Sequence, residues 1–114
     1  MDKINKYQKI LEEVLREQSE GKSENMPLVK SKLIIDKKEQ HFILMDMGWS
    51  QLGFIHNWVF HIEIKDQKVH LHKNMTDFDI VGTLIENGIA KEDIIITVLE
   101  EPSNLSESQL GEAA

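Results

Sequence analysis

The sequence lacks cysteine, contains only two prolines and has no long apolar run. Without cysteine there is no disulfide, no thiolate nucleophile and no zinc ribbon, so any metal site would use histidine and carboxylate ligands. No run approaches the roughly 18 apolar residues that span a bilayer, and the N-terminal residues lack the apolar core of a signal peptide. We therefore expect a cytoplasmic protein without a membrane anchor.

Basic residues are too few to balance the acidic ones, since 13 lysines and arginines stand against 20 aspartates and glutamates, a formal charge of −7. A chain of this sign is repelled by phosphate backbones, so we do not expect direct nucleic-acid binding. Four glutamates and no basic residue lie in residues 100–114, so the remainder carries −7 + 4 = −3. We predict one domain over residues 1–99 and a flexible acidic tail over residues 100–114.

The patterns that are present predict an α+β fold. Apolar residues at helical spacing predict an amphipathic N-terminal helix that ends near Gly21. Four β-rich runs, joined by short polar turns, then predict an antiparallel, hairpin-rich, four-stranded sheet at residues 31–36, 41–48, 54–65 and 68–73. Gly48 is expected to let the chain turn after the second run. A weak capping box of Thr76 and Asp79 predicts a second helix with Ile80, Val81, Leu84 and Ile85 inward and Gly88 as its stop. A final buried strand is predicted at residues 94–99.

The alternation from Phe54 to Lys65 predicts which of its side chains share a face. The even-numbered residues should face the core: Phe54, His56, Trp58, Phe60, Ile62 and Ile64. The run at 41–48 is apolar on both faces, so we expect it to be central and covered on both sides. Trp49 and Trp58 are predicted to anchor the core or an interface, and His56 is interpreted first as a buried structural residue.

A predicted turn at Asp66 and Gln67 sets a register in which Glu63 faces His70 and His61 faces His72. Directly opposed residues have Cβ atoms about 5 Å apart, so three imidazoles and one carboxylate would meet on one face. That is a ligand set that zinc accepts. The same residues also suit a hydrated polar face, and no other metal signal accompanies them. We predict no bound metal or cofactor, with these four residues as the candidates if one binds.

No catalytic set is evident elsewhere in the sequence. Glu63-Ile64-Lys65 resembles half of a metal-dependent nuclease motif, with Asp46 as the missing aspartate. The predicted hairpin places Asp46 near Ile55, too far along the strand from Glu63 for both to bind one Mg²⁺ ion. Nucleophile elbow, P-loop, dinucleotide and HExxH motifs are absent. We therefore predict that the protein is not an enzyme.

Several short segments, spaced without gaps, resemble one known family. They are DKINKYQKIL, Gly48-Trp49, Ile55-His56, His61-Ile62-Glu63-Ile64, Asp66 with Lys68, Thr76 with Ile80, and Gly88 with Lys91-Glu92-Asp93-Ile94. On these residues the chain, from Asp2 to about Leu99, resembles the XisI-like family, small cyanobacterial proteins described as controlling factors for excision of the fdxN element during heterocyst development. It departs from the family where a basic residue usually precedes Ile55 and where Trp and Gln usually replace His70 and His72.

The resemblance implies an accessory role in DNA rearrangement, beside a recombinase and a companion protein, XisH, that resembles a restriction-endonuclease domain. We expect a non-enzymatic control protein that binds a XisH-like partner through Trp49, His56 and Trp58, with homo-oligomerisation left open. Three other functions also stay open: an antitoxin-like inhibitor of that partner, a direct DNA-binding excisionase-type factor, and a metal-dependent hydrolase.

Overall fold

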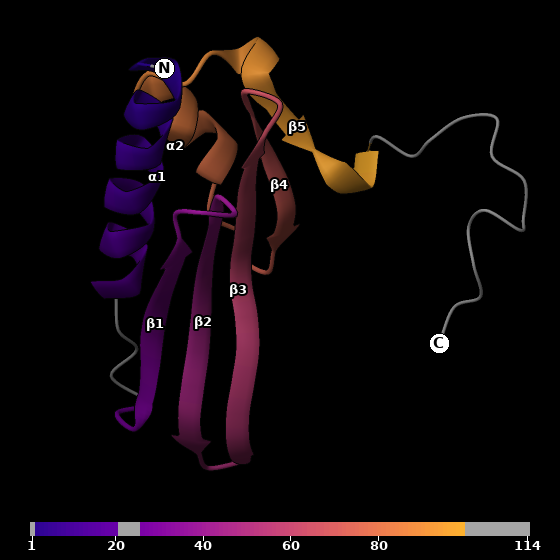
Figure 1. Ribbon diagram of the computed structural model, residues 1–114. Helices are drawn as coiled ribbons and strands as arrows, with labels where there is room; N and C mark the ends of the chain where they lie inside the picture. The colour runs from indigo at the N-terminus through magenta and orange to yellow at the C-terminus, as the bar shows by residue number, and fades with distance from the viewer. Residues whose placement is uncertain (1, 21–25, 100–114) are drawn as a thin grey trace, which may run out of the picture.

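The computed structural model describes residues 2–20 and 26–99, so the predicted tail and domain boundary lie outside the described residues. Its elements are α1 (Asp2–Glu20), β1 (Val29–Asp36), β2 (His41–Ser50), β3 (Gly53–Lys65), β4 (Lys68–Asn74), α2 (Ile80–Glu86), the 3-10 helix η1 (Lys91–Asp93), β5 (Ile94–Ile96) and the 3-10 helix η2 (Thr97–Leu99). The sheet order is β1-β2-β3-β4-β5. Neighbouring strands are antiparallel except β5, which runs parallel to β4 (Figure 1). The predicted α+β class is confirmed, with the final strand as the fifth of the sheet.

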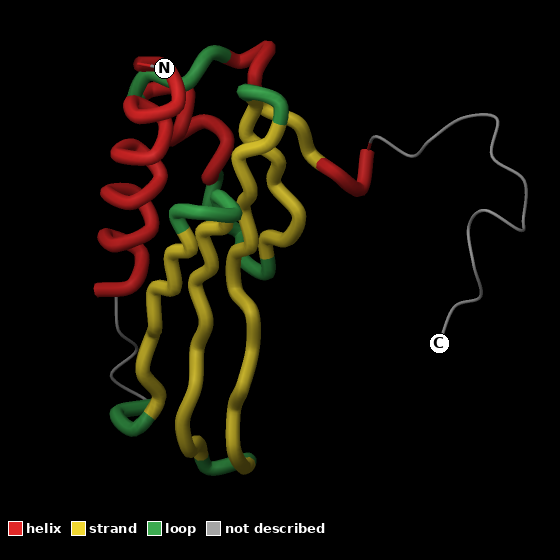
Figure 2. Tube along the Cα trace, viewed as in Figure 1, coloured by secondary structure: helices red, strands yellow, loops and turns green. Residues whose placement is uncertain are grey.

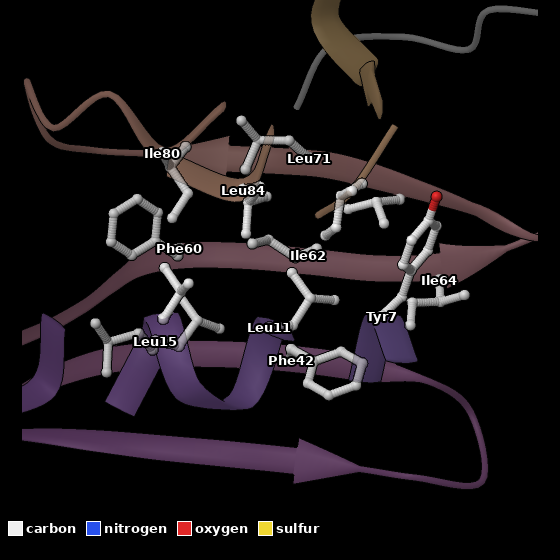
Figure 3. Close-up of a cluster of buried hydrophobic side chains, with 14 residues drawn as sticks. Tyr7, Leu11, Leu15, Phe42, Phe60, Ile62, Ile64, Leu71, Ile80 and Leu84 are labelled. Atoms are coloured by element: carbon white, nitrogen blue, oxygen red, sulfur yellow. The ribbon is translucent and has the colours of Figure 1, made fainter. Parts of the chain in front are cut away.

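Both helices lie on one face of the sheet, which gives the molecule two layers (Figures 1 and 2). The amphipathic stripe of α1 buries Tyr7, Leu11, Val14 and Leu15, as its spacing predicted. These side chains pack with Ile80 and Leu84 of α2, with Ile89, and with alternate residues of three strands (Figure 3). The strand residues in this core are Phe42, Leu44, Phe60, Ile62, Ile64, Val69 and Leu71.

We call the side of the sheet opposite the helices the open face. On β2 it carries Ile43, Met45 and Met47, which are only half-buried. The prediction that this strand is covered on both sides is therefore wrong. The reason is that both described helices pack against the same face, so the second apolar face of β2 is shielded only by neighbouring side chains.

Val59 is an extra residue in β3, and it changes which residues face the helices. Leu44 pairs with Phe60, but the next residue, Met45, pairs with Trp58. Such a β-bulge turns the rest of the strand over, because successive side chains alternate between faces. Phe54, His56 and Trp58 therefore lie on the open face and are exposed, and their predicted place in the core is wrong. Only Phe60, Ile62 and Ile64 of that predicted set are buried.

Beyond this bulge, the ends of three strands extend past the C-terminal end of α1 (Figure 1). We call residues 29–32, 45–50 and 53–58 the arm. Gly48 lies inside β2, and the chain turns at Gln51 and Leu52 instead, which corrects the predicted turn at Gly48. Gly48 is needed for another reason, because its φ is +146° and a Cβ there would overlap the carbonyl oxygen of Leu28.

The hairpin of β3 and β4 has the predicted turn, with both turn residues at positive φ, 54° for Asp66 and 63° for Gln67. This is the conformation of a type I′ turn. Glu63 pairs with His70 as predicted. A second bulge then shifts the register, so that His61 pairs with Lys73 and the predicted pairing with His72 is wrong.

The C-terminal elements differ from the predictions in detail. Asp79, not Thr76, caps α2, since its carboxylate accepts a hydrogen bond from the Gly82 amide at 2.9 Å. Ile85, predicted to point inward, is exposed because Ile80 and Leu84 set the buried face of α2 and Ile85 lies about 100° around the helix from Leu84. The strand predicted at 94–99 ends at Ile96, and Val98 and Leu99 are exposed at the sheet edge, where only one neighbouring strand remains.

Candidate interaction surface

The open face gathers the aromatic side chains that the core does not use. Trp49 and Phe54 pair across β2 and β3 with ring centroids 5.3 Å apart. Phe54 stacks near His56 at 6.3 Å, and Trp58 meets the edge of His61 at 5.5 Å. We call Trp49, Phe54, His56 and Trp58 the aromatic row. It follows β3 along the arm.

The structure brings together the three residues predicted to contact a partner: Trp49, His56 and Trp58. Exposed fractions of 62% for Trp49 and 41% for Trp58 leave large apolar surfaces in contact with water. Phe54, which is 52% exposed, joins them and was missed because unbroken alternation placed it in the core. Clustered exposed aromatic residues are typical of interaction surfaces, whereas single exposed apolar residues are not informative.

At the other end of the open face, polar side chains from three strands form a chain of polar contacts, most of them hydrogen bonds. His61 Nε2 lies 2.9 Å from His41 Nδ1, and the other nitrogen of His41 lies 3.7 Å from Glu63 Oε2. The second oxygen of Glu63 lies 2.8 Å from His72 Nε2, and His72 Nδ1 lies 2.7 Å from the Thr97 hydroxyl. The rings of His61 and His72 also lie with their centroids 5.0 Å apart, so the four side chains form a compact cluster whose polar contacts are with one another.

The charge states of Glu63 and His61 follow from the groups around them. The hydrogen bond from His72 holds the pKa of Glu63 below its ordinary value, so Glu63 is ionised at neutral pH. Burial, and then the nearby imidazoles of His72 and His41, lower the pKa of His61, which is therefore neutral.

The predicted metal candidates are only partly assembled. His61, Glu63 and His72 are in the chain, but His70 lies apart with its Nε2 3.2 Å from the Lys65 carbonyl oxygen. Within residues 2–20 and 26–99, no group of three His, Asp or Glu side chains is arranged to hold a metal ion. His41 was missed by the sequence analysis, although the β1–β2 turn and the β2–β3 register place it directly opposite Glu63.

The nuclease-like residues are also separated. Asp46 pairs with Asn57 and accepts a hydrogen bond from the Ser31 hydroxyl at 2.7 Å, on the helix side of the sheet. Glu63 lies six residues further along β3 and on the open face. The two carboxylates therefore cannot share a Mg²⁺ ion, as the sequence analysis expected.

Charge is unevenly distributed over the molecule. The strand residues of the open face include five lysines and only two acidic residues: Lys30, Lys32, Lys65, Lys68 and Lys73 against Asp36 and Glu63. Counting histidine as neutral, the formal charge of these strand residues is 5 − 2 = +3, whereas the whole chain carries −7. The solvent side of α1, by contrast, is balanced, because its four glutamates (Glu12, Glu13, Glu17 and Glu20) are matched by four basic residues (Lys3, Lys6, Lys9 and Arg16). The open face is therefore a basic and aromatic surface on an acidic protein.

Comparison with known proteins gives consistent matches. A family model described as XisI protein matches residues 1–107. The chain is similar to the crystal structure of a XisI-like protein from Anabaena variabilis ATCC 29413, with 32% identity, a TM-score of 0.74, and coverage of 82% of this chain and 84% of that one. It has the same fold as the fdxN element excision controlling factor XisI from the same organism, at 20% identity, a TM-score of 0.69, and coverage of 84% and 86%. None of the curated proteins matches. No helix in the described part of the chain is long and apolar enough to cross a membrane.

Proposed function

Because this chain belongs to the XisI family, we propose that it is a non-enzymatic control protein of DNA element excision that acts by binding a XisH-like, endonuclease-type partner. The aromatic row carries the proposal. It places two tryptophans, a phenylalanine and a histidine side by side on a surface that no described helix covers.

The aromatic row has the properties of an interface core. Tryptophan is among the residues that contribute most binding energy when a partner removes them from water, and charged residues are depleted at the centre of such patches. Met45 and Met47 lie between the row and β1 and add adaptable apolar contacts. Lys30 and Lys32 form a charged rim on β1. A partner that covers the row would therefore bury an apolar centre surrounded by polar groups.

The chemistry of the open face also supports a binding role over a catalytic one. Its linked polar groups, His61, His41, Glu63 and His72, contact one another and include no serine, cysteine or lysine that could serve as a nucleophile. A general base needs a substrate proton within hydrogen-bond reach. Three clefts in the described part of the chain are lined by α1 residues, by Asn87 or by residues around Trp49, and none of the three is lined by these groups. We propose that other proteins cut and rejoin the DNA during excision.

The proposal is tested by co-expressing the chain with the XisH-like protein of its host and purifying through a tag on this chain. We expect a stable complex. A Trp49→Ala, Trp58→Ala double variant should weaken it by about 2 kcal/mol or more, roughly 30-fold in Kd. Ile85→Ala is the matched control, because Ile85 is an exposed apolar residue on α2, away from the row. Recovery of the chain alone at low and physiological salt, or a double variant that binds as tightly as Ile85→Ala, would contradict the proposal.

A further inference from the structure

We propose that the acidic segment of residues 100–114 binds in cis to the open face of the sheet and competes there with the partner. The segment lies outside the described residues, and only its sequence enters the argument. Its effect on partner binding rests on the proposed function, whereas the intramolecular contact does not.

Charge complementarity favours this occupant. The segment carries four glutamates and no basic residue. The open face carries five lysines and only two carboxylates. One of these carboxylates, Glu63, already accepts a hydrogen bond from His72. Three of the lysines, Lys65, Lys68 and Lys73, lie on the hairpin nearest the C-terminal end of the described chain. By contrast, the outer side of α1 carries four glutamates balanced by four basic residues, so it offers the segment no net attraction.

The starting point of the segment favours it as well. The described chain ends in η2, where the Thr97 hydroxyl contacts His72 at 2.7 Å on the open face. The next two residues, Val98 and Leu99, are 76% and 72% exposed. The segment therefore begins beside the polar chain of histidines, at the edge of the proposed binding surface.

The length of the segment is sufficient to reach the arm. Fifteen residues span at most about 50 Å when extended, and the 13 residues of β3 span about 44 Å. Leu105 and Leu110 supply two apolar side chains that can contact the aromatic row. The contacts need only be weak, since a tethered segment has an effective concentration on the order of millimolar. A partner would have to displace the segment before it reaches Trp49 and Trp58.

The contact is tested on the isolated full-length chain by paramagnetic NMR. Because the sequence has no cysteine, a Ser108→Cys variant takes one spin label at a known position. We expect the label to broaden amide signals of β3 and β4 more than those of α1, and the difference to disappear at 1 M salt, where the Debye length is about 3 Å.

A variant with all four glutamates of the segment changed to glutamine is the matched control, since it keeps the length and both leucines. It should lose most of the broadening. A triple variant of the open face, Lys65→Gln with Lys68→Gln and Lys73→Gln, should lose the broadening too. A double variant of α1, Lys6→Gln with Lys9→Gln, should retain it. Equal broadening of α1 and the open face, or none on either, would overturn the inference and leave the proposed function standing.

A second measurement links the contact to partner binding. A chain that ends at Leu99 should bind the XisH-like partner at least ~3-fold more tightly than the full chain, because no segment competes for its open face. Equal affinities of the two chains for the partner would overturn the inference that the segment competes with it. Failure of both chains to bind the partner, with the NMR contact present, would reject the proposed function and retain the intramolecular contact.

Discussion

Asp93 is the only charged residue that is buried among those described, and its partners come from the far end of the chain. Its carboxylate accepts a hydrogen bond from the Tyr7 hydroxyl at 2.6 Å and pairs with Lys3 Nζ at 2.9 Å. The Lys3 ammonium, and then the Tyr7 hydroxyl, hold the pKa of Asp93 below its ordinary value. The same burial raises the pKa of Tyr7. These contacts fasten η1 to the first turns of α1.

Asp93→Asn should destabilise the protein by about 1–3 kcal/mol, because it removes a charged acceptor from the buried Tyr7 hydroxyl and from the partly exposed Lys3 ammonium. A folded-state pKa below the unfolded value means that this stabilisation is present above about pH 4 and is lost as the pH falls through the folded pKa. The difference between wild type and variant in urea unfolding should therefore be full at pH 7 and shrink towards pH 2. A difference that stays constant over this range would contradict the role of the ionised carboxylate.

Gly48 is the residue whose backbone conformation the arm depends on. Gly48→Ala should cost about 2 kcal/mol or more, since it combines a disfavoured φ with a collision against the backbone of Leu28. Gly53→Ala is the control, because its φ is also positive but an added Cβ meets nothing within 4 Å. Thermal unfolding should rank Gly48→Ala clearly below Gly53→Ala. Equal losses would show that only the dihedral angle matters.

At the scale of the elements, the helices and hairpins follow from the sequence, whereas the two bulges do not. The period of α1 and the polar turns between strands are local signals, and they gave the element order correctly. A bulge leaves alternation looking intact, because Val59 is apolar like its neighbours, yet it moves Phe54, His56 and Trp58 to the opposite face. His41 was missed for a related reason, since its contact with Glu63 depends on two strand registers at once.

The turn between β3 and β4 provides a prediction at this scale. Asp66 and Gln67 both adopt the left-handed conformation, which costs a non-glycine residue roughly 1–2 kcal/mol. Gln67→Gly should stabilise the protein by about 0.5–1 kcal/mol, after subtracting the entropy that glycine adds to the unfolded chain. The corresponding rise in Tm is about 4 °C. Gln51→Gly is the control, because Gln51 is not among the turn residues with positive φ, and it should be neutral or destabilising. A lower Tm for Gln67→Gly would contradict the argument.

At the scale of the whole molecule, net charge describes the surface poorly. The total of −7 predicts only that phosphate backbones repel the protein. The fold instead gathers five lysines against two carboxylates on the open face, whereas acidic and basic residues balance on the solvent side of α1. Sequence composition cannot reveal this distribution, because it arises only when helix and sheet pack together. The charge that bears on the proposed partner contact is therefore that of the open face and not that of the whole chain.

The two layers also predict unequal stability along single strands. Phe42 and Leu44 of β2 are fully buried under α1, whereas Met47 and Trp49 of the same strand lie in the arm, where no described helix packs. Local opening is easiest where few apolar contacts hold the backbone. Native-state hydrogen exchange should therefore show protection factors ~100-fold lower for the arm amides of β2 and β3 than for residues 42–44 and 60–64. Equal protection would mean that arm and core open only together. Binding of the partner to the aromatic row should raise protection in the arm first, because that is where it would supply the missing second layer.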